Sequence, residues 1–202
     1  IRNDVTGKTF ACFEPSVDYI VVKFPKWPFD KFNTESRTLG TQMKATGEVM
    51  SIGRTIEESL LKAIRSLEIG LYHLENKRFD GMSEDKLTEY IKVGTDDRIY
   101  AIAELLRIGC SKEKIAQASG IDVLFINKLK NIIDKETEIK TNPLNTDVLR
   151  VAKKTGFSDR EIAKLWNLSE TEIFKIRKYA GIIPVYKMID TCASEFDSYV
   201  PY

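Results

Sequence analysis

The 202-residue sequence predicts a mainly α protein, in which an all-α helical domain follows a small α+β segment. Two short apolar runs of strand type lie near the N-terminus, and helical periodicity takes over from Ser83 onward. A helical hairpin pattern also occurs twice, with an offset of 47 residues. Hydrophobic residues make up 43% of the chain, which is enough for a sizeable core.

The first predicted strand lies over residues 19–22, where a tyrosine and three β-branched residues follow one another. Pro15 and Pro25 are expected to bound this strand, because proline cannot donate a hydrogen bond to a neighbouring strand. The second strand is predicted over residues 49–52, with a glycine close to each end. These glycines indicate a strand that other backbone approaches closely.

A helix is predicted to begin at Thr55, because Thr55 and Glu58 have the spacing of a capping box. Apolar residues then recur at helical spacing, so one face of the helix should be buried. That face consists of Leu60, Ala63, Ile64 and Leu67. With the two strands, this helix gives a small α+β segment over residues 1–70.

Residues 71–82 interrupt the periodicity and are predicted to be a connection to the all-α domain over residues 83–190. Ser83 is expected to cap the first helix of that domain, and Thr95 or Asp96 to begin the next. Gly109 follows at the C-terminus of the second helix, where a left-handed residue is favoured.

The repeated unit covers residues 109–129 and residues 156–176. Each copy is predicted to hold a capped short helix, a tight turn and a longer helix, and residues 146–155 form a helix before the second copy. Two further capping boxes are predicted in the second copy. They are formed by Ser158 with Glu161 and by Ser169 with Glu172.

Charge and cysteine content exclude several classes of protein. The 31 basic and 30 acidic residues give a net charge of +1, which does not indicate a polyanionic partner. Cys12, Cys110 and Cys192 are far apart and lack metal-ligand spacing, so reduced cytoplasmic thiols are expected. No signal peptide and no membrane-spanning run is found, and His73 is the only histidine.

The second copy of the repeat also has a DNA-binding interpretation, because residues 162–178 are patterned like a helix-turn-helix. Lys175, Arg177 and Lys178 would then contact phosphates. Against this interpretation, Glu170 and Glu172 stand in the turn that would face DNA. A helix-turn-helix DNA-binding protein therefore remains the alternative to a domain of packed helical hairpins.

Residues 41–68 read TQMK-x-x-GEVM-x-IGRT-x-EES-x-x-KA-x-RSLE and closely resemble the large chain of carbamoyl phosphate synthetase. In that family the stretch closes the first ATP-grasp half, which makes carboxyphosphate. Three further segments are similar to the same family: residues 3–9 (NDVTGKT), 13–25 (FEPSVDYIVVKFP) and 185–196 (VYKMIDTCASEF).

The resemblance implies a particular division of the chain. Residues 1–70 would be the C-terminal remnant of the ATP-grasp carboxyphosphate domain, and residues 83–190 the oligomerisation domain. Residues 191–202 would begin the linker to the second ATP-grasp half. The chain is accordingly expected to be an internal piece of a longer polypeptide.

The resemblance also implies the activity of the parent protein. That protein would make carbamoyl phosphate from bicarbonate, glutamine-derived ammonia and two ATP, with Mg or Mn and K, for arginine and pyrimidine biosynthesis. Its expected partners are a glutaminase small chain and the second ATP-grasp half, while this piece itself would self-associate. A motif like E-x-N-P-R, which supplies magnesium ligands in ATP-grasp enzymes, does not occur here. We therefore assign no catalytic, cofactor-binding or metal-binding residue, and expect the piece alone to be inactive.

One site follows from the resemblance. In this family carbamate travels inside the protein from the first active site to the second, and the QMK-x-x-GEVM stretch is similar to one that lines the route. Met43 and Glu48 are the candidate lining residues. The alternative is that Glu48 only satisfies neighbouring backbone or an arginine such as Arg54.

Overall fold

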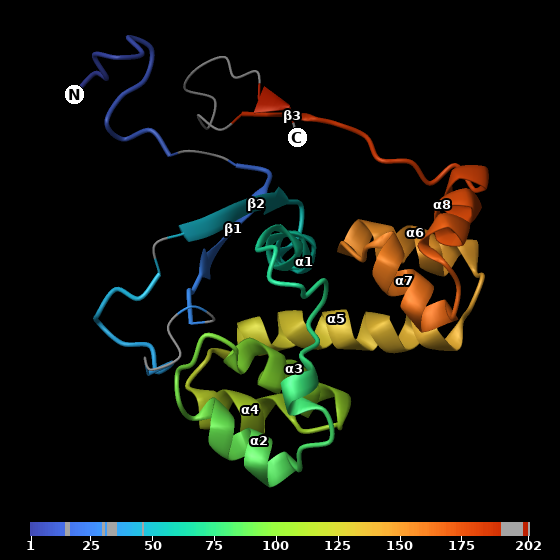
Figure 1. Ribbon diagram of the computed structural model, residues 1–202. Helices are drawn as coiled ribbons and strands as arrows, with labels where there is room; N and C mark the ends of the chain where they lie inside the picture. Colours follow the sequence, from blue (N-terminus) through green and yellow to red (C-terminus); the bar gives the residue numbers. More distant parts are fainter. Residues whose placement is uncertain (15–16, 30, 32–35, 46, 191–199, 202) are drawn as a thin grey trace.

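The computed structural model describes residues 1–14, 17–29, 31, 36–45, 47–190 and 200–201 (Figure 1). A two-stranded sheet and one helix lie on a larger body of helices, so the predicted mainly α fold is confirmed. Within the described part of the chain, no helix is both long and apolar enough to cross a membrane.

The sheet pairs strand β1 (Ile20–Lys26) with strand β2 (Gly47–Gly53) in antiparallel register, from Ile20 opposite Gly53 to Lys26 opposite Gly47. Both predicted strands are present, but the prediction that Pro25 ends the first one is wrong. Pro25 lies inside β1, opposite Glu48. Proline is tolerated there because, among the described residues, β1 has a partner strand on one side only.

Helix α1 (Ile56–Ser66) packs on this sheet with its predicted apolar face buried. Thr55 caps it, since its hydroxyl accepts the Glu58 amide at 3.1 Å, and the Glu58 carboxylate accepts the amide of Arg54 at 2.9 Å. Two serines tie the helix to the strands: Ser59 donates to the Ile20 carbonyl at 3.1 Å, and Ser51 donates to the Ser59 carbonyl at 2.5 Å.

Seven helices form the larger body, and α5 is its longest element (Figure 1). Helix α5 contacts α1, α3, α4, α6 and α7, and it buries five apolar side chains along its length. The helices are α2 (Glu84–Ile91), α3 (Arg98–Arg107), α4 (Lys112–Ser119), α5 (Val123–Thr141), α6 (Thr146–Thr155), α7 (Asp159–Trp166) and α8 (Glu170–Tyr179).

The repeat predicted from the sequence corresponds to two helical hairpins, α4–α5 and α7–α8. Gly120 and Asn167, both with positive φ, turn the chain between the helices of each pair. The capping box of Ser169 with Glu172 is confirmed in full. In the other predicted box, Ser158 accepts the Glu161 amide, but the Glu161 side chain turns elsewhere, so the second half of that prediction is wrong.

Two predicted helix starts also need correction. Ser83 stands at the N-cap of α2 but makes no side-chain cap bond. Helix α3 begins at Arg98, after Asp97, because the Asp97 carboxylate is engaged by Arg78, Tyr90 and Thr95 instead of capping the helix.

Residues 71–82 pack into the core, although they hold only one short 3₁₀ turn, η1 (Lys77–Phe79). Leu74 and Phe79 are buried in the same apolar cluster as α1 and the large helices. One apolar core therefore runs across residue 70. The core shows no break at the predicted domain boundary, which remains a prediction. Near the C-terminus, β3 (Met188–Ile189) pairs with β4 (Val200–Pro201), while Cys192 and most of the predicted linker lie outside the described residues.

Candidate functional site

The two predicted passage residues both lie at the surface of the described chain. Met43 is 82% exposed, in the loop that leads to β2. The side chain of Glu48 is 54% exposed, and its carboxylate forms an ion pair with Lys23 of β1 at 3.0 Å. The ion pair is with Lys23, whereas Arg54 had been the suggested partner. Among the described residues, neither side chain lies in an enclosed channel, and the role of Met43 and Glu48 in a passage remains a prediction.

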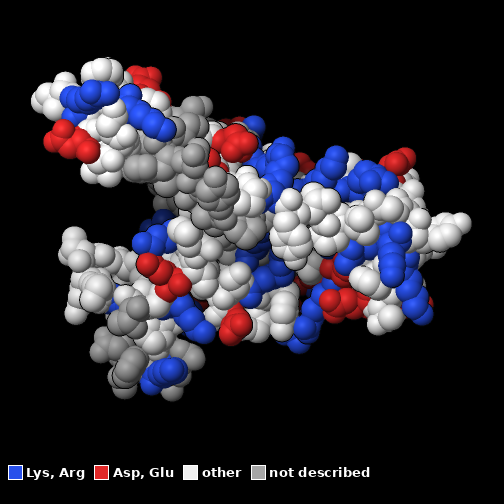
Figure 2. Space-filling model, turned by 90° about the horizontal axis from the view of Figure 1, so that it is seen from above, with Lys and Arg blue, Asp and Glu red and all other residues white. Residues whose placement is uncertain are grey.

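The α7–α8 hairpin is poorly suited to DNA, because Arg177, one of its three predicted phosphate contacts, is engaged within the protein, although Lys175 is exposed. Arg177 donates from Nε to Asp159 Oδ2 at 2.7 Å and from Nη1 to the Ile182 carbonyl at 3.2 Å. Lys178 and Arg177 both lie near the ring of Phe174. In addition, acidic and basic side chains are interspersed on the face seen in Figure 2, where DNA would need a continuous basic surface.

The first turn of α5 exposes three consecutive large apolar side chains, and we call this set the α5 apolar turn. Val123 is 40% exposed, and Leu124 and Phe125 are each 52% exposed. Successive residues of a helix point about 100° apart, so three in a row cannot all face the core. Isolated exposed apolar residues are common, but adjacent ones form a patch of the kind that contacts another protein.

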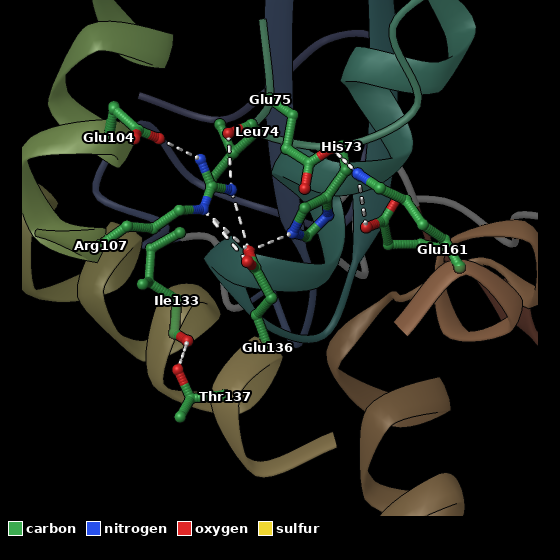
Figure 3. Close-up of polar contacts among 10 residues, drawn as sticks. His73, Leu74, Glu75, Glu104, Arg107, Ile133, Glu136, Thr137 and Glu161 are labelled. Carbon is green, nitrogen blue, oxygen red and sulfur yellow. Dashed lines mark hydrogen bonds and ion pairs between the residues drawn. The ribbon is translucent and has the colours of Figure 1, made fainter. Parts of the chain in front are cut away.

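Inside the helical body, an ionic cluster joins three parts of the chain at Glu136 of α5, where His73 is buried and Arg107 and Glu136 are half-buried (Figure 3). Arg107 of α3 donates from Nη2 to Glu136 Oε2 at 2.9 Å and to the Leu74 carbonyl at 2.8 Å. His73 Nε2 lies 3.3 Å from the same Oε2 atom, and its ring packs against Phe157. The cluster therefore fastens residues 73–74 to α3 and α5.

The charge state of Glu136 shows what this cluster can do. Burial would raise the pKa of Glu136, but hydrogen bonds and positive charge from His73 and Arg107 outweigh burial and lower that pKa to about 2. The pKa of Arg107 is raised, since its bonds and attraction to Glu136 outweigh the effect of burial. A carboxylate held this strongly in its ionised form is a weak base, so the cluster stabilises the fold rather than transferring protons.

Glu161 of α7 lies beside the cluster, but the cluster donates no hydrogen bond to its Oε1 atom (Figure 3). Its side chain is 6% exposed, and Oε1 has no hydrogen-bond partner. Lys164, which is paired with Glu75, comes only to 3.9 Å from that oxygen. Burial raises the pKa of Glu161, and the negative charges of Glu75 and Glu136 act in the same direction.

Sequence reasoning did not find this cluster. His73 was noted only as the single histidine, and Arg107 and Glu136 fall within helices where charged residues are usually solvated. The available signal was a histidine in a segment without periodicity, close to the apolar residues Leu71 and Leu74. Its partners lie 63 and 34 positions away along the chain, beyond the reach of any local pattern.

A family model described as carbamoyl-phosphate synthetase large chain, oligomerisation domain, matches residues 48–181. The match begins in β2 and extends through α1 and all the large helices to the end of α8. It therefore contains the ionic cluster, both hairpins and the α5 apolar turn, whereas Met43 lies just before it.

Proposed function

The chain belongs to the family of the carbamoyl-phosphate synthetase large chain oligomerisation domain, and we propose that its helical body brings copies of the chain together. The family's description names oligomerisation, which supports self-association. The observation that carries the proposal for this chain is the α5 apolar turn, where three adjacent large apolar side chains face solvent. Burying such a patch against a second copy would remove apolar surface from water.

The parent protein is a ligase of the carbamoyl-phosphate synthetase family. We propose that it makes carbamoyl phosphate from bicarbonate, glutamine-derived ammonia and two ATP, using Mg or Mn and K, for arginine and pyrimidine biosynthesis in the cytoplasm. Its partners would be a glutaminase small chain and the second ATP-grasp half. Within this arrangement the present chain would be a structural joint without activity of its own.

A lining role for Met43 and Glu48 belongs to the same proposal. Both side chains are exposed here, so they are free to face other residues of the longer large chain. The ion pair of Glu48 with Lys23 joins exposed side chains and is worth little, so Glu48 can exchange this partner at small cost.

The test of self-association is sedimentation velocity over a wide range of protein concentration. The proposal expects the mean sedimentation coefficient to rise with concentration toward that of a dimer or larger species. A single monomeric species at every concentration would contradict it. An assay of bicarbonate-dependent ATP hydrolysis on the same samples tests the second part, for which no turnover is expected.

A further inference from the structure

Residues 36–45, which we call the strap, are fastened to the helical body by Arg37. Its guanidinium forms a two-pronged contact with Asp96, with Nε to Oδ1 at 2.8 Å and Nη2 to Oδ2 at 2.6 Å. The same Nη2 lies 3.2 Å from Asp97 Oδ2. Such paired contacts between a guanidinium and a carboxylate are stronger and more directional than single ones.

Asp97, the second acceptor of Arg37, is held in place by other groups. Asp97 is 3% exposed and accepts hydrogen bonds from Tyr90 at 2.5 Å, Arg78 at 2.6 Å and Thr95 at 3.0 Å. It therefore keeps its position whether or not Arg37 is bound. One of the two carboxylates that the strap contacts is thus in place before the strap binds.

The backbone of the strap adds two further contacts. The Leu39 amide donates to the Gly94 carbonyl at 2.6 Å, and Thr38 forms an isolated bridge with Thr95. The strap is also folded on itself, because Lys44 donates to the carbonyls of Ser36 and Thr38. It should consequently move as one piece.

No side chain of the strap is buried. Its anchorage is thus polar, in contrast to β1, α1 and the large helices, whose apolar side chains share the core. Segments without buried apolar contacts open with a much smaller free energy than the core. Contacts between exposed charges also weaken as the salt concentration rises.

Arg37 lines a cavity of about 90 Å³, together with Asp96, Asp97, Trp27 and Tyr100. Tyr100 is 4% exposed, and its buried hydroxyl has no hydrogen-bond partner. Asp96 and Asp97, to which the strap is fastened, thus line the same cavity as Tyr100. A cavity of this size has room for several waters.

We propose that the strap opens and closes over this cavity, with the Arg37 contact on Asp96 and Asp97 as its latch. Opening increases the access of water and small polar solutes to the half-buried Trp27 and to the buried Tyr100 hydroxyl, while the core stays folded. The inference does not depend on the proposed function, because it concerns contacts within one copy of the chain.

Amide hydrogen exchange at Leu39 tests the latch. Arg37→Ala should speed this exchange roughly tenfold, since the two-pronged contact with Asp96 is lost. Arg37→Lys keeps the positive charge but cannot form the two-pronged contact with Asp96, and it should give an intermediate rate of exchange at Leu39. Lys130→Ala, which removes an exposed ion pair with Asp134, is the matched control and should leave the rate of amide exchange at Leu39 unchanged. The amide of buried Ile102 shows whether the whole fold has been affected.

Quenching of tryptophan fluorescence by acrylamide, a small polar solute, tests the opening. Trp166 is 7% exposed, so most of the quenching reports on Trp27. Quenching should increase in Arg37→Ala, and in the unchanged protein at 1 M salt, in parallel with exchange at Leu39. The proposal is overturned if Leu39 exchanges equally fast with and without Arg37, or if exchange rises while quenching stays constant.

Discussion

Glu136 is the residue at which the connection, α3 and α5 meet, and its contribution to stability depends on pH. Its pKa is lowered from 4.5 to about 2 in the folded protein. A lowered carboxyl pKa stabilises the fold at pH values above the unfolded pKa, and this stabilisation is lost as pH falls toward the folded pKa. The shift corresponds to about 3 kcal/mol at neutral pH.

Glu136→Gln should therefore lower the free energy of unfolding by about 3 kcal/mol at pH 7, because Arg107 is left buried without its counter-charge. Near pH 3 the difference from the unchanged protein should be clearly smaller. Urea unfolding at both of these pH values measures the difference in the free energy of unfolding. Glu138→Gln on the same helix, where the carboxylate is 43% exposed and pairs with Lys135, should cost less than about 0.5 kcal/mol. An equal loss at both pH values would contradict the account.

Glu161 should have the opposite effect on stability. Its pKa is raised by burial from 4.5, so folding is penalised as pH rises above this unfolded value and through the folded pKa. Glu161→Gln removes the charge and should stabilise the protein by about 1 kcal/mol at pH 8, with little gain at pH 4.

Thermal or urea unfolding at the two pH values checks the prediction for Glu161. Glu89→Gln is the control, because that side chain is 74% exposed and makes only a surface ion pair. If Glu161→Gln destabilises the protein at pH 8, Glu161 has a stabilising partner that this account lacks.

At the scale of elements, helix α1 approaches the end of α6 so closely that only glycine fits there. Gly156 has φ of +103°, and a Cβ atom on it would lie 2.9 Å from the Cα atom of Glu58. Arg65 of α1 also donates to the Gly156 carbonyl at 2.7 Å. This contact joins the α+β segment to the second hairpin.

Gly156→Ala should accordingly destabilise the protein by about 2–4 kcal/mol, from backbone strain together with overpacking against α1. Gly120→Ala is a matched control, because Gly120 also has positive φ but no atom within 4 Å of the added Cβ. It should cost only about 1 kcal/mol. Similar losses in the two variants, measured by urea unfolding, would show that the approach of α1 is less tight than described.

Local sequence patterns predicted many of the elements, because capping and turn residues act within a few positions. The range of α6 and the box of Ser169 with Glu172 were found in this way. The same patterns failed where a side chain had a distant partner. The helix predicted to begin at Thr95 or Asp96 starts at Arg98, and Thr95 instead donates to Asp97, which Arg78 and Tyr90 also hold.

At the scale of the whole molecule, long-range polar contacts fix how the segments sit together. Arg37 reaches Asp96, and His73 and Arg107 reach Glu136. Charged residues of this kind look like solvated surface in the sequence, so their pairing could not be predicted. Self-association was expected from the family resemblance without a specific surface, and we propose the first turn of α5 because the structure exposes three adjacent large apolar side chains there.

The central claim is that copies of this chain associate through the α5 apolar turn. Sedimentation equilibrium of the unchanged protein and of a Leu124→Gln, Phe125→Gln double variant tests it most directly. We expect the double variant to associate at least tenfold more weakly, because central apolar contacts carry most of the binding energy. Met43→Gln, at a side chain that is 82% exposed and outside the family match, should associate like the unchanged protein. Equal association of all three proteins would contradict the claim.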